Sequence, residues 1–353
     1  MKSAASGDTL DHRAALGDPA AQVDLAAVLD ARGHHAAAID WLARAARADH
    51  PPALRLLGIR LSTGLNAPGL PLEGADLIRR AAGLGDGKAL ALLAVFAGTG
   101  YLQPQDLALA LDFGRKAAAR GWTPARDQLA LLSAGPDGQA AGVDVDLAVW
   151  RRPPPGEIRS ARPRVTSFPN LLPAAVCDAL IERSRSRLVR AEVIDPTSGR
   201  PIVEKTRTNR LATISLFDSD LLSIVVQERL AAAASVPTTT LEAMSVLNYL
   251  PGEQSRPHFD FIDPQAPSYG AEITQLGQRV ATILVYLNDS YKGGETSFPE
   301  LGIDHRGKRG DALLFFNVDA TGAPDRRTVH AGRPPLSGQK WVVSQFIRSR
   351  PRT

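Results

Sequence analysis

The first 135 residues repeat an alanine and leucine pattern, and this repeat constrains the fold more than any other feature of the chain. Four segments align without gaps, and in each of them an alanine is followed four residues later by a leucine. The pairs are Ala21 and Leu25, Ala53 and Leu57, Ala89 and Leu93, and Ala125 and Leu129. The last three of these alanines follow one another at intervals of 36 residues. A repeat near that length, with two helices per unit, is typical of an α-solenoid.

A second helical stretch lies between these segments and carries a pair of alanines at 45–46, 81–82 and 117–118. Small side chains where helices cross let the two helices approach closely. The stretch "WLARAARA" (41–48) and its counterparts resemble the Sel1-like branch of the tetratricopeptide superfamily. The resemblance implies a repeat domain over 1–135 that can bind a protein partner. An alanine-rich helical bundle without true repeats remains the alternative.

Residues 136–164 interrupt the helical pattern. The stretch "RRPPPGEIRSARPR" (151–164) holds three consecutive prolines, which cannot continue a helix, so we expect a linker or a loop that leads into the next domain. Within it, "VDVDLAVW" (143–150) can form one short strand because its apolar residues alternate with polar ones.

The pattern after residue 165 is different. Two helical stretches, 173–188 and 219–234, precede four runs rich in Val, Ile, Phe, Tyr and Leu. These runs are 244–250, 279–287, 310–318 and 340–347. No helices alternate with them, which argues against a doubly wound parallel sheet and favours a jelly roll. The expected fold class is therefore α+β multidomain, with an N-terminal α-solenoid followed by a double-stranded β-helix (jelly-roll) domain with flanking helices over 165–353.

Composition excludes several classes of function. The chain has 41 Lys and Arg against 37 Asp and Glu, without a long block of like charges, so we expect no nucleic-acid partner. No apolar run is long enough to span a membrane, and no secretory leader is recognisable at the N-terminus. The single cysteine, Cys177, excludes an intramolecular disulfide and a cysteine-only zinc site. We expect a cytoplasmic protein, and the Ala-, Arg- and Pro-rich composition suggests a bacterial source.

The candidate metal ligands are His258 and Asp260 in "RPHFDF" (256–261), together with the distant His330. Residues two apart on a strand point to the same face, so one ion can contact both. Such a pair alone is common by chance. Two imidazoles and one carboxylate, with the remaining positions open, suit non-heme Fe(II), whereas a structural zinc site normally takes four protein ligands.

Five stretches in order resemble the catalytic domain of the prolyl 4-hydroxylases, members of the Fe(II)/2-oxoglutarate dioxygenases. They are "NYLPGEQSRPHFDF" (248–261), "RVATILVYLND" (279–289), "GGETSFP" (293–299), "RGDALLFFN" (309–317) and "HAGRPPLSGQKW" (330–341). The resemblance implies that His258, Asp260 and His330 bind the iron and that the cofactors are Fe(II), 2-oxoglutarate and O2, with ascorbate as reductant.

The resemblance also implies roles for residues around the metal. Lys340 would pair with the distal carboxylate of 2-oxoglutarate, and Tyr249 and Thr296 would donate hydroxyl hydrogen bonds to it. The alternatives are strand packing for the two hydroxyl residues and an exposed strand-end position for the lysine. Arg279 is expected to have either a structural or a catalytic role, and His305 is expected to be a loop residue.

Two features depart from the family pattern. Ser255 stands where the family commonly has an aromatic residue, which would widen the pocket near the metal. Segment 204–217 resembles the mobile substrate loop of the family, with its "R-x-S" changed to Arg207-Thr208-Asn209. Arg207 and Asn209 are therefore candidate substrate contacts, with plain loop solvation as the alternative. Segment 262–278 is long and polar enough to be a second flexible rim.

The function implied is hydroxylation of an unactivated C–H bond, with release of succinate and CO2. The expected substrate is a prolyl residue of a peptide or protein. A hydroxylase of a free amino acid or small metabolite is the first alternative. A catalytically silent repeat scaffold that only binds partners is the second.

Overall fold

The structure is a computed structural model that describes residues 9–138, 144–194, 201–202, 206–265 and 270–351. The chain divides into two compact units, Met1–Leu129 and Ala130–Thr353. Within the described residues, no helix is both long enough and apolar enough to cross a membrane.

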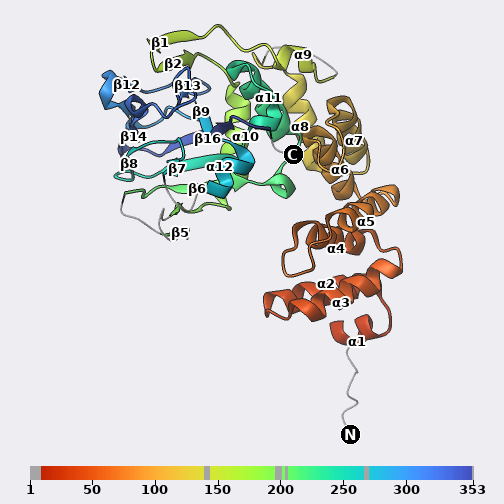
Figure 1. Cartoon of the computed structure of the whole chain (residues 1–353). Coiled ribbons are helices and arrows are strands. Elements are labelled where there is room, and N and C mark those ends of the chain that lie inside the picture. The colour runs from red at the N-terminus through yellow and green to blue at the C-terminus, as the bar shows by residue number, and fades with distance from the viewer. Residues whose placement is uncertain (1–8, 139–143, 195–200, 203–205, 266–269, 352–353) are drawn as a thin grey trace. The chain divides into compact units, whose positions relative to one another are not determined.

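The first unit is built from antiparallel helical hairpins, drawn red to orange in Figure 1. After α1 (Leu10–Ala15), the helices α2 and α3, α4 and α5, and α6 and α7 pair in sequence order. Their bounds are α2 (Pro19–Ala31), α3 (His35–Arg47), α4 (Pro51–Thr63), α5 (Pro71–Gly83), α6 (Gly87–Thr99) and α7 (Leu107–Ala119). The boundary between the units falls within α8 (Thr123–Ser133). The carboxylates of Asp18, Asp86 and Asp106 cap the starts of α2, α6 and α7, where backbone N–H groups lack helical partners.

The repeated small residues lie where the helices meet. Ala21, Ala53 and Ala89 are completely buried. A Cβ atom on Gly58 would lie only 2.6 Å from the carbonyl oxygen of Gly74, so α4 and α5 pack backbone against backbone at this crossing. The predicted α-solenoid is confirmed.

The second unit contains a large antiparallel sheet of eight strands in the order β1-β2-β13-β9-β16-β7-β6-β3. Their bounds are β1 (Glu157–Ala161), β2 (Arg164–Phe168), β13 (Ala312–Phe316), β9 (Arg279–Tyr286), β16 (Lys340–Arg348), β7 (Met244–Tyr249), β6 (Arg210–Ile214) and β3 (Val189–Arg190). Four of these strands, β7, β9, β13 and β16, are the apolar runs predicted from the sequence.

A smaller sheet of four strands has the order β12-β11-β14-β8. Its strands are β12 (Ile303–His305), β11 (Thr296–Phe298), β14 (His330–Gly332) and β8 (Ser255–His258). Phe298 of this sheet packs in one core cluster with Leu284, Phe315 and Val342 of the large sheet. The apolar core therefore lies between the two sheets, as expected for the predicted jelly roll.

The remaining elements flank this sandwich. The helices are α9 (Leu147–Trp150), α10 (Ala174–Arg185), α11 (Leu221–Ala234) and α12 (Gly270–Leu276), and two small ribbons pair β10 (Lys292–Gly293) with β15 (Pro335–Ser337) and β4 (Val193–Ile194) with β5 (Pro201–Ile202). Helix α11 is almost entirely buried, including its charged residues Glu228 and Arg229. The predicted helices 173–188 and 219–234 correspond to α10 and α11.

One local prediction within 136–164 was wrong. The expected strand at 143–150 is replaced at 147–150 by helix α9, because the Asp146 carboxylate accepts from the backbone N–H groups of Ala148 and Val149. Trp150 is buried and donates its indole N–H to the carbonyl of Leu132. Part of the expected linker forms the hairpin β1-β2, which extends one edge of the large sheet.

Candidate metal centre and co-substrate pocket

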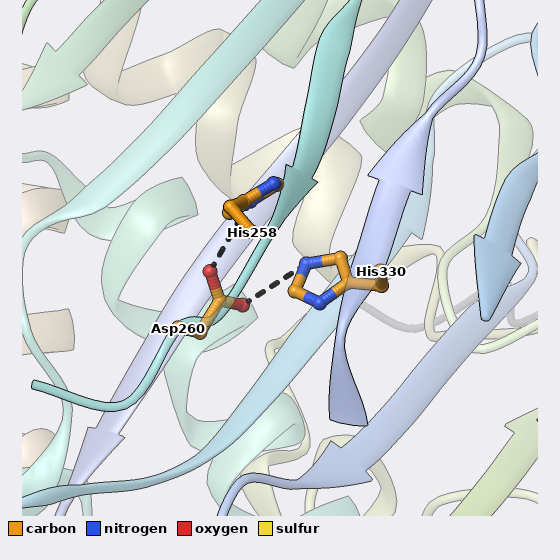
Figure 2. A group of neighbouring side chains, drawn as sticks. All are labelled: His258, Asp260 and His330. Atoms are coloured by element: carbon orange, nitrogen blue, oxygen red, sulfur yellow. Dashed lines mark ion pairs between the residues drawn. The ribbon is translucent and has the colours of Figure 1, made fainter. Parts of the chain in front are cut away.

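Strands β8 and β14 bring the three candidate metal ligands together. His258 lies directly opposite His330 in the antiparallel register, and Asp260 follows two residues after His258. One ligand atom from each of the three residues lies within 4.8 Å of the others. Asp260 Oδ1 is 3.6 Å from His258 Nε2, and Asp260 Oδ2 is 3.5 Å from His330 Nε2. Dashed lines mark these two pairs in Figure 2. The two histidines therefore present their Nε2 atoms to one carboxylate.

The backbone fixes which nitrogen of each imidazole can bind a metal. His258 Nδ1 lies 2.8 Å from the carbonyl oxygen of Arg256, and His330 Nδ1 lies 3.0 Å from that of Thr328. A carbonyl only accepts hydrogen bonds, so each Nδ1 carries the proton and each Nε2 keeps its lone pair. Metal-binding histidines are commonly oriented by this type of hydrogen bond. The donor set thus fits one divalent cation.

The carboxylate of Asp260 is held by a buried chain of hydrogen bonds. The hydroxyl of Thr282 donates to Asp260 Oδ2 at 2.8 Å, and the side-chain amide of Asn317 donates to that hydroxyl oxygen at 3.1 Å. Burial raises the pKa of Asp260, but the two imidazoles and the Thr282 hydroxyl hold it below its usual range. The carboxylate is therefore ionised and fixed in orientation.

The imidazole of His258 is also in the form that binds metals. Burial, followed by the neighbouring His330, lowers the pKa of His258 to about 4. The ring is consequently neutral at neutral pH, as a metal ligand must be.

Lys340 lies deep in the same pocket as these ligands. It begins β16 opposite Tyr249 of β7, and it is only 2% exposed. Its Nζ donates to the carbonyl of Gly294 at 2.7 Å and lies 5.4 Å and 5.5 Å from the ring centres of Tyr249 and Tyr286. Burial lowers the pKa of Lys340 to about 7. This ammonium has hydrogen-bonding capacity left for a buried anion, and the expected alternative of an exposed lysine does not describe its position.

The two candidate hydroxyl residues line this pocket as well. Tyr249 and Thr296 are both buried, and Tyr286 donates its hydroxyl proton to Thr296 Oγ1 at 2.8 Å. The Thr296 proton is therefore free to point toward a ligand. The cavity that these two residues line is small, about 50 Å³.

The two candidate substrate contacts have different positions. Arg207 lines the pocket beside Ser255 and pairs with it in an isolated β-bridge. Asn209 is completely buried outside the pocket lining, and its Oδ1 accepts from Arg207 Nε at 3.3 Å. Asn209 thus contacts Arg207 rather than the pocket. Residues 204–205 of the candidate loop lie outside the described residues.

Two further residues and one segment have positions that the sequence left open or misplaced. Arg279 binds the Glu242 carboxylate with two hydrogen bonds, at 2.7 Å and 2.9 Å, and does not line the pocket. His305 was expected in a loop, but it ends β12 opposite Thr296, and its ring centre is 5.5 Å from that of Tyr286. Within the expected rim 262–278, helix α12 is tied to Arg348 through Glu272, while residues 266–269 lie outside the described residues.

Sequence reasoning missed Thr282, Asn317 and Tyr286 as parts of the site. A polar residue inside an otherwise apolar strand was the available signal for Thr282, since "RVATILVY" places it among buried residues. The partners of these side chains depend on strand pairing, which the sequence alone does not specify.

Comparison with known proteins identifies the family. Residues 244–348 match the model of the 2OG-Fe(II) oxygenase superfamily. The probable prolyl 4-hydroxylase 9 of Arabidopsis thaliana is 31% identical over 217 residues, which cover 55% of this chain and 72% of that protein. The chain belongs to the 2OG-Fe(II) oxygenase superfamily. The resemblance to the prolyl 4-hydroxylases seen in the sequence is thereby confirmed.

Other relatives match one part of this chain. Prolyl 4-hydroxylase subunit alpha-1 of Rattus norvegicus is 33% identical over 189 residues, or 54% of this chain and 35% of the rat protein. The chain thus spans about a third of the length of that curated relative. For the repeat unit, the Sel1 repeat protein from Oxalobacter formigenes is 30% identical, with 34% of this chain and 94% of that chain covered and a TM-score of 0.31.

Membership of this superfamily gives the site its chemistry. The cofactors of the oxygenase domain are Fe(II), 2-oxoglutarate and O2. Two imidazoles and one carboxylate would hold Fe(II) and leave coordination positions for 2-oxoglutarate and O2.

Proposed function

We propose that the chain is an Fe(II)- and 2-oxoglutarate-dependent dioxygenase of the procollagen-proline 4-dioxygenase type. It would hydroxylate a prolyl residue of a peptide or protein. The observation that carries the proposal is that Lys340 lines the same pocket as His258, Asp260 and His330. A metal site and a buried cation for an oxo acid are the two requirements of this chemistry, and here they occur together.

Each residue has a distinct proposed task. His258, Asp260 and His330 hold the ferrous ion through their Nε2 atoms and a carboxylate oxygen. Lys340 neutralises the distal carboxylate of 2-oxoglutarate, and the hydroxyls of Tyr249 and Thr296 donate to the same co-substrate. Lys340 suits this task because its ammonium has lost its hydration by burial, so a carboxylate ligand restores favourable interactions that the free protein lacks.

When bound, the cofactors would supply the oxidation: one atom of O2 would enter succinate as 2-oxoglutarate loses CO2, and the other would form the new hydroxyl of the substrate. The chain orients the reactants and excludes water. Thr282, supported by Asn317, keeps the Asp260 carboxylate in one orientation. Because the pocket walls are largely buried side chains, the reacting atoms are shielded from solvent.

The substrate would enter past Arg207 and Ser255, which lie at the pocket lining near His258. We propose that Arg207 contacts the substrate and that Asn209 positions the guanidinium of Arg207 through their hydrogen bond. The side chain of Ser255 leaves more space beside the metal than an aromatic ring would. Prolyl 4-hydroxylases among the relatives support a prolyl substrate.

The proposed organisation assigns 1–135 to the repeat domain and 165–353 to the oxygenase domain. Since hairpin β1-β2 belongs to the large sheet, we add residues 157–164 of the expected linker 136–164 to the oxygenase domain. The repeats would bind a protein partner. Ascorbate as reductant, a cytoplasmic location and a bacterial source remain predictions from the sequence.

The direct test is succinate formation by the full chain with Fe(II), 2-oxoglutarate and proline-containing peptides. Matched peptides with alanine in place of proline serve as the control, and mass spectrometry locates the added oxygen. The proposal predicts succinate release coupled to one added oxygen on proline. Equal oxygen transfer to the alanine peptides, or succinate release only with a free amino acid, would refute the prolyl assignment.

A further inference from the structure

The repeat unit contains a second concave site, which the oxygenase chemistry does not use. It is an open hollow of about 380 Å³ lined by the start of α4 and by the two inter-helix segments 84–88 and 120–122. All of its lining residues belong to the first compact unit. Its size is within the range of ligand sites in proteins.

The walls of the hollow are fixed by close packing. A Cβ atom on Gly87 would lie 3.0 Å from Cβ of Trp122 and 3.3 Å from the carbonyl oxygen of Ala117, so the two segments lie directly against each other. Gly85 has φ +93°, and a side chain there would collide with the guanidinium of Arg120. The glycines thus allow Arg120 to lie over the neighbouring segment, and the hollow needs little rearrangement before it binds a ligand.

The charges in the hollow are unbalanced. Arg55 is neutralised, because its Nε donates to both carboxylate oxygens of Asp86 at 3.2 Å and 3.1 Å. Lys88 Nζ lies 4.9 Å from the ring centre of Trp122. Among the residues that the structure describes, neither Lys88 nor Arg120 has a carboxylate partner. Two cations beside an aromatic ring and two prolines therefore remain available to a ligand.

The repeat itself does not require these residues. One period of 36 residues earlier, the positions of Lys88, Arg120 and Trp122 carry Pro52, Leu84 and Asp86. A structural role in stacking the repeats would call for similar residues at each junction. Of the two junctions compared, only the later one carries two cations and an aromatic ring at these three positions. This difference favours a binding role for Lys88, Arg120 and Trp122.

We propose that this hollow binds an acidic segment of a partner polypeptide. Carboxylates of the segment face Lys88 and Arg120, and an adjacent apolar side chain packs on Trp122 and Pro51. A peptide suits the site better than a nucleic acid, because nucleic-acid binding usually draws on many phosphate contacts and this chain has 41 basic against 37 acidic residues. The inference does not depend on the oxygenase reaction.

The test uses the full chain and an array of short fluorescent peptides rich in Asp and Glu beside Leu and Phe. Each has a counterpart with Asn and Gln in place of the acids, and a labelled single-stranded RNA is included. Fluorescence anisotropy without iron or 2-oxoglutarate measures binding. We expect acidic peptides to bind, their counterparts to bind at least about tenfold more weakly, and binding to weaken as salt is added.

Charge reversal locates the site. The double variant Lys88→Glu with Arg120→Glu should weaken acidic-peptide binding by at least about tenfold, because like charges then face each other. The matched control reverses two exposed arginines of the same unit, Arg32→Glu with Arg47→Glu, and should bind as the unaltered chain does. If charge reversal unfolds the repeats, Lys88→Gln with Arg120→Gln replaces it and should also weaken binding. Equal loss in the control, no preference for acidic peptides, or preferred binding of the RNA would overturn the proposal.

Discussion

Replacing Lys340 by methionine should separate protein stability from co-substrate binding. Methionine has a similar length and no charge, so it removes the buried ammonium and keeps most of the packing. Burial lowers the pKa of Lys340 from 10.5 to about 7. One pKa unit is worth about 1.4 kcal/mol, so burial destabilises the charged form of Lys340 by about 5 kcal/mol relative to the neutral form when no ligand is bound.

The variant should therefore be at least as stable as the unaltered chain at neutral pH, because replacing a buried charge by an apolar group is often neutral or stabilising by about 1–4 kcal/mol. Its affinity for 2-oxoglutarate should fall by about 30-fold to several thousandfold, since removing one partner of a buried charge pair costs about 2–5 kcal/mol. Thermal unfolding and anaerobic calorimetric titration with Fe(II) and 2-oxoglutarate measure the two effects. The exposed Lys292→Met is the matched control and should change neither.

The sign of the pH dependence follows from the same pKa. In the unfolded chain Lys340 keeps a proton up to about pH 10.5, whereas in the folded chain it loses the proton near pH 7. The unfolded state binds more protons between these values, so this residue makes the folded state more stable as pH rises through that window. Affinity for 2-oxoglutarate should fall over the same range, because binding must restore the proton. A less stable variant that binds 2-oxoglutarate normally would refute the reasoning, as would an affinity that is constant from about pH 6 to pH 9.

Three other predictions follow from contacts in the structure. Thr282→Val should weaken Fe(II) binding by about 10–100-fold without unfolding the chain, because Asp260 loses its orienting hydrogen bond. Thr282→Ser keeps a hydroxyl and should bind Fe(II) as the unaltered chain does, and an anaerobic metal titration measures both variants. Arg348→Met should lower the free energy of unfolding by about 1–3 kcal/mol in a denaturant titration, because the buried carbonyl of Gly277 loses its donor. The Glu242 carboxylate keeps its two hydrogen bonds from Arg279, and an unchanged free energy of unfolding would contradict the prediction. Gly58→Ala should destabilise the repeats by about 1–3 kcal/mol in thermal unfolding, because the new methyl group would overlap a backbone carbonyl of the adjacent helix. Unchanged stability would contradict the close packing of α4 against α5.

Periodic features of the sequence predicted the elements well. The recurring alanines, such as Ala53 and Ala89, lie buried between paired helices because a repeat must present the same small residues at each crossing. Strands β9 and β16 are buried along nearly their whole length, so their sequences are almost continuously apolar. This apolar composition is what predicted them as strands. A pattern that extends over many residues therefore predicts its helix or strand even though tertiary contacts are unknown.

Short segments were predicted less well because their structure depends on distant partners. The alternation in 143–150 indicated a strand, but Asp146 caps a helix there and buries Trp150. Hairpin β1-β2 depends on pairing with β13, which lies about 140 residues later in the chain. His305 became part of a strand for the same reason, through its pairing with Thr296.

The candidate site shows the same division. The spacing of His258 and Asp260 indicated that both could contact one ion, and the resemblance to the prolyl 4-hydroxylases supplied His330 and Lys340. The hydrogen bonds that orient these side chains could not be predicted. The link from Asn317 to Thr282 exists only because β9 and β13 are neighbours in the large sheet.

Anaerobic titration with Fe(II) tests the central claim most directly. The full chain should bind one ferrous ion, and His330→Ala should abolish that binding because only one imidazole and one carboxylate would remain at the site. His305→Ala, which alters a histidine outside the ligand group, should bind iron as the unaltered chain does. If His330→Ala binds Fe(II) with undiminished affinity, the three side chains do not form the metal site and the account is contradicted.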